Sequence, residues 1–106
     1  MEFEFPTTRQ GVISLLWENQ DWDFILGGRY DHQVVNVKSI ELSATELVVI
    51  VVSVSLFRPE GQEETFTILP NGEYTCEVET FSTNKPSDYD MKVNPYRGWK
   101  DKIKLV

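Results

Sequence analysis

This chain of 106 residues has little of the side-chain chemistry on which catalysis and metal binding usually depend. It has a single cysteine, Cys76, and a single histidine, His32, which excludes an internal disulfide and any metal site built from paired Cys or His ligands. The motifs of phosphate-binding loops, dinucleotide-binding turns and serine-hydrolase elbows are missing as well. These absences argue against the common enzyme classes, and we predict no cofactor and no metal.

Long apolar segments are also missing. The most apolar run, residues 47–57 (LVVIVVSVSLF), is 11 residues long, whereas a membrane-spanning helix needs about 20. The first residues, MEFEFP, do not resemble a signal peptide. With only one cysteine in the chain, we therefore expect a cytoplasmic protein that does not enter a membrane.

Basic residues are scarce and unevenly distributed. Residues 1–84 carry 14 acidic and 4 basic side chains, whereas residues 85–106 carry 3 acidic and 6 basic ones, and the net charge is −7. Because phosphate binding needs a basic surface, the composition argues against nucleic acid as a direct ligand. A basic protein partner is compatible with it, and so is the simpler reading that the acids keep the protein soluble.

What the chain does contain is a strong signal for β-strands. Residues 47–57 include six Val or Ile residues and no glycine, proline or charge, which favours a strand over a helix. Two similar turns follow, Arg58-Pro59-Glu60-Gly61 and Leu69-Pro70-Asn71-Gly72. Their form is typical of hairpin loops with a left-handed glycine, so they predict a three-stranded meander over residues 46–81.

The two turns also predict how the strands pair. If both are three-residue loops, Arg58 pairs with Gln62 and Leu69 pairs with Glu73, and the sheet then has one apolar and one polar face. Only Glu64 among the core positions is charged. The predicted apolar face consists of Val48, Ile50, Val52, Val54, Leu56, Phe66, Ile68, Tyr74, Cys76 and Val78. The polar face consists of Ser53, Ser55, Glu63, Thr65, Thr67, Thr75, Glu77 and Glu79, together with Leu47, Val49 and Val51, which something else must cover.

Further strands are predicted on both sides of this meander. Residues 1–5, 34–42 and 99–106 alternate or are rich in β-branched side chains, and Gly27-Gly28 fits the two-residue turn of a hairpin. Residues 12–17 fit either a strand or a short helix capped by Thr8, and Gly11 favours the strand.

These elements predict one all-β domain over residues 1–106. The expected architecture is an antiparallel β-sandwich or partly open β-barrel of about seven to eight short strands. The alternative is an α+β fold with one short N-terminal helix.

The first candidate site follows from the Gly27-Gly28 hairpin. This turn would place Asp23 directly across from His32, with Tyr30 one step away on the same face. A carboxylate beside an imidazole suits a general base or a pH-sensitive contact. The same pair is also common as a surface interaction worth at most about 1 kcal/mol.

The second candidate site is the polar sheet face. Glu63, Glu77 and Glu79 lie on it, and the predicted register places Glu63 opposite Glu79, where like charges are mildly destabilising. A basic partner would offset that cost. Carboxylates on a flat sheet lack the converging oxygens of a calcium loop, and a simple solvated face is the alternative.

The third candidate site is the polar segment 82–96. Tyr89 and Tyr96 lie in it beside Asp88, Asp90 and Arg97. Aromatic side chains are favoured anchors in interfaces, so a contact surface is expected unless these rings only pack the loop.

We therefore predict a non-enzymatic, acidic protein–protein interaction module. It would be an inhibitor or immunity-type protein that covers a basic site, or a component of a larger assembly, and it could form a homodimer. The alternative is a small-molecule-binding β-barrel in which Asp23, Tyr30 and His32 could act catalytically. The two readings differ in whether the apolar face packs shut or leaves a cavity lined by residues such as Trp22, Phe66 and Tyr74.

Overall fold

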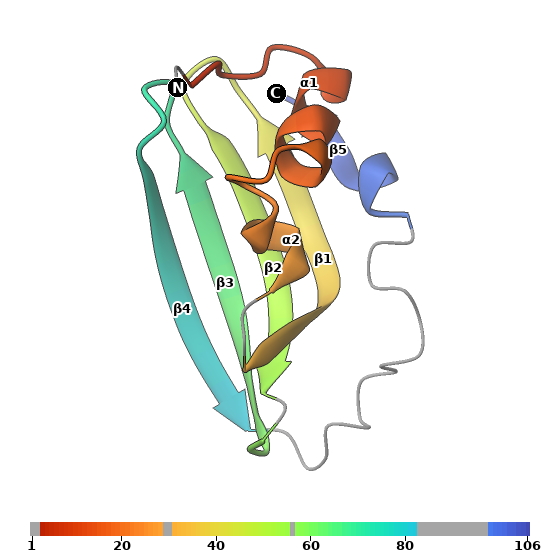
Figure 1. The fold of residues 1–106 in the computed structure, drawn as a ribbon, viewed down its shortest axis with the longest axis vertical. Coiled ribbons are helices and arrows are strands. Elements are labelled where there is room, and N and C mark those ends of the chain that lie inside the picture. The colour runs from red at the N-terminus through yellow and green to blue at the C-terminus, as the bar shows by residue number, and fades with distance from the viewer. Residues whose placement is uncertain (1–2, 29–30, 56, 83–97) are drawn as a thin grey trace.

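The computed structural model describes residues 3–28, 31–55, 57–82 and 98–106, and it contains one sheet of five strands in the order β4-β3-β2-β1-β5 (Figure 1). Strands β1 to β4 form an antiparallel meander, and β5 pairs in parallel with β1. The strands are β1 (His32–Leu42), β2 (Leu47–Ser55), β3 (Glu60–Ile68), β4 (Tyr74–Ser82) and β5 (Ile103–Leu105).

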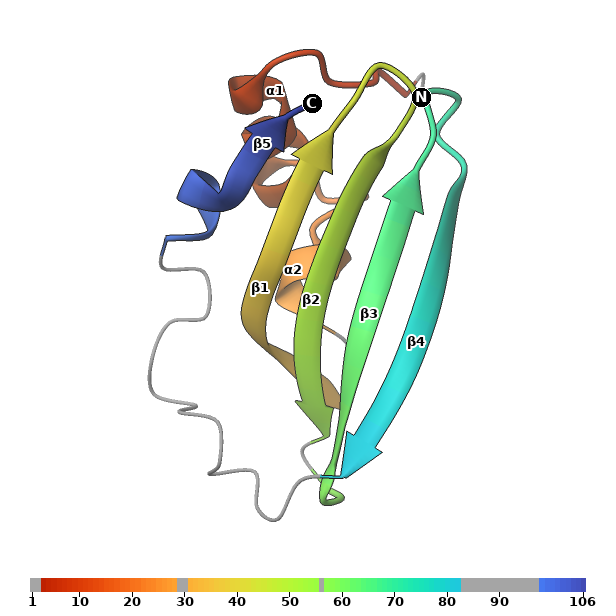
Figure 2. The same cartoon turned by 180° about the vertical axis from the view of Figure 1, so that it is seen from behind.

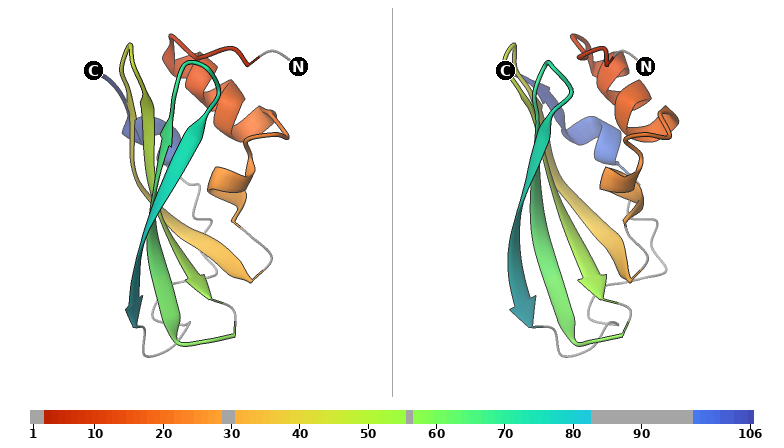
Figure 3. Two further views of the ribbon diagram at one scale, coloured as in Figure 1. Left: turned by 90° about the vertical axis from the view of Figure 1, so that its left-hand side faces the viewer. Right: turned by 60° about the vertical axis from the view of Figure 1, so that its left-hand side comes forward.

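Short helices cover one face of this sheet. Helix α1 (Arg9–Ile13), the π-helical turn η1 (Ser14–Glu18) and helix α2 (Phe24–Gly27) lie on the same side (Figure 3), over the half of the sheet that contains the β1–β2 turn. We call the covered side the inner face. On β2 it carries Leu47, Val49, Val51 and Ser53; on β3, Glu64, Phe66 and Ile68; on β4, Tyr74, Cys76 and Val78.

The opposite side is the outer face, and no described element covers it (Figure 2). On β2 it carries Val48, Ile50, Val52 and Val54; on β3, Gly61, Glu63, Thr65 and Thr67; on β4, Thr75, Glu77, Glu79 and Phe81.

The segment after Thr8 is helical, so the strand predicted over residues 12–17 is wrong. The Thr8 hydroxyl accepts a hydrogen bond from the Gly11 amide (3.0 Å) and so caps the first turn. Val12, Leu15 and Leu16 have the three- and four-residue spacing of one helix face, and all three are buried against the sheet. This periodicity outweighs Gly11, which favoured a strand, and the capped helix predicted as the alternative is confirmed.

The hairpin predicted at Gly27-Gly28 is also wrong. Phe24–Gly27 is a helical turn, and Gly28 ends it with φ of +78°. A Cβ on Gly28 would lie 2.6 Å from the His32 carbonyl oxygen, so the chain passes close to β1 at this point. Gly28 therefore terminates a helix instead of joining two strands.

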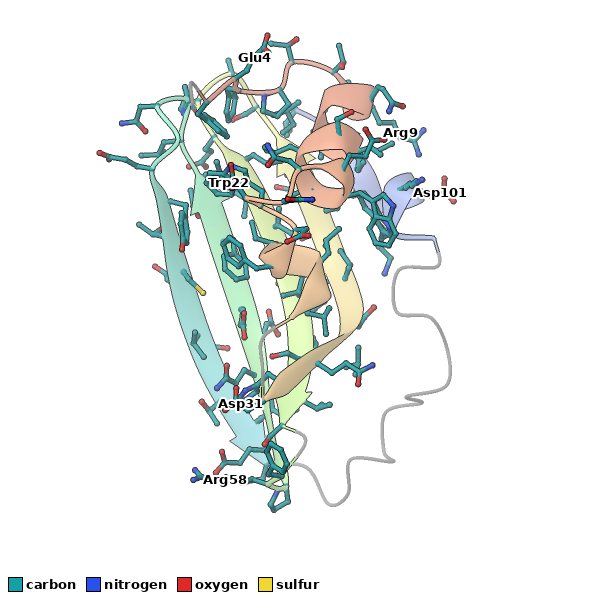
Figure 4. The ribbon with its side chains drawn as sticks, in the orientation of Figure 1. Glu4, Arg9, Trp22, Asp31, Arg58 and Asp101 are labelled. Atoms are coloured by element: carbon teal, nitrogen blue, oxygen red, sulfur yellow. The ribbon has the colours of Figure 1, made fainter. Side chains whose placement is uncertain are left out.

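The C-terminal segment links the helical layer to the far edge of the sheet. The 3₁₀ helix η3 (Trp99–Lys102) precedes β5, so only part of the strand predicted over residues 99–106 forms. The Arg9 guanidinium donates to the Lys100 carbonyl (2.6 Å) and to the Asp101 carboxylate (3.2 Å). The side chains of Arg9 and Asp101 face one another in Figure 4. Trp99 is buried against this junction, with its ring 6.1 Å from that of Trp17.

The two proline-glycine turns behave differently. At the second turn Gly72 has φ of +88°, the Leu69 amide donates to the Glu73 carbonyl (2.8 Å), and Ile68 pairs with Tyr74, so the predicted register of β3 and β4 is confirmed. At the first turn Gly61 is already inside β3.

A polar side chain and an aromatic ring explain the first turn. The Ser55 hydroxyl accepts hydrogen bonds from the amides of Phe57 (3.2 Å) and Arg58 (3.1 Å), which ends β2 early. Gly61 pairs with Phe81, whose ring covers it so closely that a Cβ would lie 2.5 Å from ring atoms. The glycine at this turn therefore makes room for a ring, not for a left-handed turn.

As a result, the face of β2 that was predicted to lie outside is the one that packs in the core. The prediction placed Glu64 opposite Leu56, whereas Glu64 lies opposite Val51. The register of β2 against β3 is therefore shifted by five residues. Because side chains alternate between the faces of a strand, a shift by an odd number exchanges the two faces. Leu47, Val49 and Val51, predicted to be outside, have no exposed surface and form the core with the helices. Val48 and Ile50, predicted to be core, are half-buried on the outer face.

The protein is thus mostly β, as the sequence predicted. In the described residues the strands form one sheet with helices on a single face, so the sandwich or barrel and its seven to eight strands are not confirmed. The described helices are all too short to cross a bilayer.

Candidate functional site

The predicted pairing of Asp23 with His32 does not form. Asp23 immediately precedes α2 and is exposed, whereas His32 begins β1 and pairs with Ser55. A neighbour supplies the carboxylate instead, because His32 Nδ1 lies 2.9 Å from Asp31 Oδ1. Since a carboxylate only accepts, the proton of this hydrogen bond is on Nδ1. Asp31 lies near the end of the sheet that the helices leave open (Figure 4), and Tyr30 lies outside the described residues.

The third predicted site was the polar segment 82–96. Tyr89 and Tyr96, with Asp88 and Asp90 and Arg97, all lie outside the described residues. Their role in binding stays a prediction.

The acidic residues of the sheet lie where the second candidate site requires them. Glu63 is opposite Glu79, as predicted, and Glu77 is opposite Thr65 on the same outer face. Lys38, which is at an irregularity of β1, reaches across β2 and places its Nζ 3.0 Å from Glu63 Oε2. Among the described residues Glu77 and Glu79 have no basic partner, so the uncompensated charge of this face is on β4.

Strand β4 is also an edge strand with little protection. It has nine residues, eight of them exposed, and among the described strands it pairs only with β3. Edge strands are commonly blunted by lysine, proline, a bulge or a covering element. The sequence of β4, YTCEVETFS, has neither lysine nor proline, its pairing with β3 is regular, and its carboxylates are the only charges on it.

The outer face between β4 and β1 is apolar along β2. Val48 and Ile50 are half-buried, while Val52 and Val54 are buried although no described element lies over them. The ring of Phe81 lies over Gly61, which pairs with Val54 on one side and with Phe81 on the other.

The inner face has a cavity in the part of the sheet that the helices leave open. It has a volume of about 280 Å³ and lies beyond the end of α2, where the helical cover stops. Its lining combines aromatic and polar side chains: Phe24, Gly28, His32, Ser53, Glu64, Phe66, Tyr74 and Cys76. Trp22, Phe66 and Tyr74 were predicted to line a cavity if one existed; Phe66 and Tyr74 line this one, and Trp22 does not. Glu64 carried the one available signal, because it is the only charged residue at a core position of the meander.

Glu64 is the most unusual side chain of this cavity. Only 4% of its surface is exposed, and the Ser53 hydroxyl, itself 1% exposed, donates to Glu64 Oε1 at 3.1 Å. The predicted register put Ser53 on the opposite face, so sequence reasoning could not bring these two residues together. Charged residues are seldom buried this deeply unless they are paired.

Comparisons with protein-family models, curated proteins and solved structures found no match for this chain. Within the described ranges no group of three or more His, Cys, Asp or Glu side chains is placed to hold a metal ion. The edge strand β4 and the cavity of the inner face are therefore the two features of the described structure that can indicate a function.

Proposed function

We propose that this chain is a non-catalytic interaction module that binds a basic, extended segment of another protein along strand β4. The observation that supports it is the coincidence of a long exposed edge with two carboxylates, Glu77 and Glu79, that have no basic partner among the described residues. The partner would be the target of an inhibitor or immunity-type protein, or a neighbour in a larger assembly, in the cytoplasm.

The edge supplies the affinity in this proposal. A strand that adds to a sheet edge gains a row of main-chain hydrogen bonds, while its side chains alternate between the two faces. On the outer face an added strand would run beside Thr75, Glu77 and Glu79. Lysine or arginine at every second position of the partner would meet these carboxylates.

The charges supply the selectivity. Glu63 and Glu79 oppose one another, and Lys38 pairs with Glu63, so a basic side chain beside Glu79 would relieve repulsion within this protein. The net charge of −7 would also accelerate encounter with a basic partner at low ionic strength.

The same carboxylates oppose one form of self-association. Two β4 edges brought together in a symmetric dimer would place glutamates of one copy close to glutamates of the other, which is destabilising. A homodimer, if it forms, is therefore expected to use another surface, and the β4 edge is kept for a basic segment.

The alternative of a catalytic barrel receives less support. Asp23 and His32 are not neighbours, so no described geometry joins them in acid–base chemistry.

The test is capture of partners from a lysate of the native host on immobilised protein. Wild type is compared with the double variant Glu77→Lys/Glu79→Lys and with the control Glu18→Lys/Asp21→Lys, which changes the charge equally on the helical layer. A basic protein retained by wild type and by the control, released by salt, and reduced at least about tenfold on the β4 variant is the expected result. Equal loss on both variants, or no retained protein, contradicts the proposal.

A further inference from the structure

Strand β4 has an apolar side as well as an acidic one. On the inner face Tyr74 is 47% exposed and Val78 is 46% exposed, although residues of the core lie on the neighbouring strand. On the outer face the same strand carries the carboxylates of Glu77 and Glu79. A strand added to this edge would therefore meet apolar side chains on one face and carboxylates on the other.

The hydrogen bonds of β4 show which of its residues face the edge. The Leu69 amide donates to the Glu73 carbonyl, so these two residues are a hydrogen-bonded pair. Such pairs alternate along a regular antiparallel ladder, so the main chain of Glu77 bonds to β3, as does that of every second residue of β4. The residues between them direct their main-chain groups away from β3. They are the inner-face residues Tyr74, Cys76, Val78 and Thr80.

The cavity of the inner face lies beside this edge. Its lining on β4 consists of Tyr74 and Cys76, which are both exposed. The ring of Tyr74 is 5.7 Å from that of Phe24 and 6.5 Å from that of Phe66, so one wall of the cavity is a continuous aromatic surface. The volume of about 280 Å³ is just below the lower limit of typical small-molecule sites, roughly 300 Å³. A single side chain of a partner suits this size better than a separate ligand does.

From these observations we propose that β4 selects a partner strand in which basic and apolar residues alternate, and that one apolar side chain of this strand packs into the cavity. This inference rests on the proposed function and specifies its partner. The side chain across from Cys76 would have Tyr74 and Val78 as diagonal neighbours, within reach of an aromatic ring. Basic residues at the intervening positions would lie across from Glu77 and Glu79.

The first experiment measures the binding of three labelled synthetic peptides to the full chain by fluorescence anisotropy. The first peptide, Lys-Leu-Lys-Phe-Lys-Leu-Lys, has the proposed alternation. The second, Lys-Lys-Leu-Phe-Leu-Lys-Lys, has the same composition without it, and the third, Lys-Thr-Lys-Thr-Lys-Thr-Lys, alternates basic and polar residues. The first is expected to bind at least about tenfold more tightly than either of the others. Equal binding of all three, or no binding of the first, overturns the proposal.

A matched pair of variants tests whether the apolar side of β4 makes the contact. Val78→Thr and Val106→Thr make the same change at two exposed valines, one on β4 and one that follows β5 at the opposite edge of the sheet. Threonine is as well suited to a strand as valine is, so both variants should fold. Val78→Thr is expected to weaken the alternating Leu-Phe peptide about fivefold, whereas Val106→Thr leaves its binding within about twofold. An equal loss in both variants overturns the proposal.

The double variant Glu77→Lys/Glu79→Lys separates the failure of this inference from the failure of the proposed function. It is expected to weaken the alternating Leu-Phe peptide at least about tenfold. If wild type binds the Lys-Thr peptide just as tightly and the double variant loses both, β4 binds basic strands but does not select apolar side chains, so this inference alone is wrong. If the double variant keeps the alternating Leu-Phe peptide, the carboxylates are not used, and the proposed function fails together with this inference.

Discussion

The two faces of the sheet are built from the same strands but meet different surroundings. On β2 the inner residues Leu47, Val49 and Val51 are fully buried under the helices, while Val48 and Ile50 on the outer face have no helix over them. Both sets are apolar, so the hydrophobic pattern of β2 alone does not distinguish the core from the surface. The helical layer, with Val12, Leu15 and Leu16, decides which side becomes the core.

The largest expected effect comes from a charge placed on either face of β2. Val49→Asp puts an unpaired carboxylate into the core, so we expect the protein to lose more than about 4 kcal/mol of stability and to unfold. Val48→Asp puts the same group on the outer face and should cost no more than about 1 kcal/mol. Urea denaturation followed by circular dichroism measures both.

This pair of variants also distinguishes the two registers. If β2 and β3 paired as the turn sequence alone predicts, Val48 would be in the core and Val49 outside. The order of the two losses would then be reversed, which contradicts the fold described above.

The next effect concerns the connection between the helical layer and the sheet. Gly28→Ala forces a side chain onto a left-handed residue whose Cβ would collide with the His32 carbonyl, and should cost about 1–3 kcal/mol. Gly27→Ala adds a methyl group in open space at the end of α2 and should stabilise the protein by about 0.5–1 kcal/mol. Thermal unfolding of the two variants gives opposite shifts of Tm, and shifts of the same sign would contradict the placement of α2.

A smaller effect separates the two turns. Gly72→Ala strains a left-handed residue and should cost about 1–2 kcal/mol. Gly61→Ala should cost less than about 1 kcal/mol, because the obstacle is the far end of the Phe81 side chain, which can move.

A double-mutant cycle tests the cause of each loss. The cost of Gly61→Ala should largely disappear in a Phe81→Ala background, whereas the cost of Gly72→Ala should be unchanged there. Equal coupling of both glycines to Phe81 would contradict the different roles that we assign to Gly61 and Gly72.

The smallest effect is expected on the outer face. Removing the exposed pair of Lys38 and Glu63 with Lys38→Met should change stability by at most about 1 kcal/mol, and less in high salt. A loss as large as that of Gly28→Ala would mean that the outer face is not a simple solvated surface.

The turns show how far the sequence could predict this fold. Phe3 packs against Gly72, but Leu69-Pro70-Asn71-Gly72 keeps the turn geometry that local rules assign to it, so those rules predicted the correct register of β3 and β4. At the other turn the Ser55 hydroxyl binds the amides of the next residues, and the ring of Phe81, 20 residues along the chain from Gly61, packs over that glycine. A long-range contact of this kind is invisible in a single sequence.

The candidate sites follow the same division. Glu63 opposite Glu79 was predicted because it depends only on the second turn. The contact of Ser53 with Glu64 was missed because it depends on the first turn, and the Asp23–His32 pair failed because α2 replaced a hairpin.

The most direct test of the proposed function is amide hydrogen exchange of this protein with and without the partner captured from the lysate. Addition of a strand predicts slower exchange at alternate residues of β4, where amides that point away from β3 gain hydrogen bonds. Unchanged exchange along β4, with protection appearing instead on α1 or β5, would contradict the account.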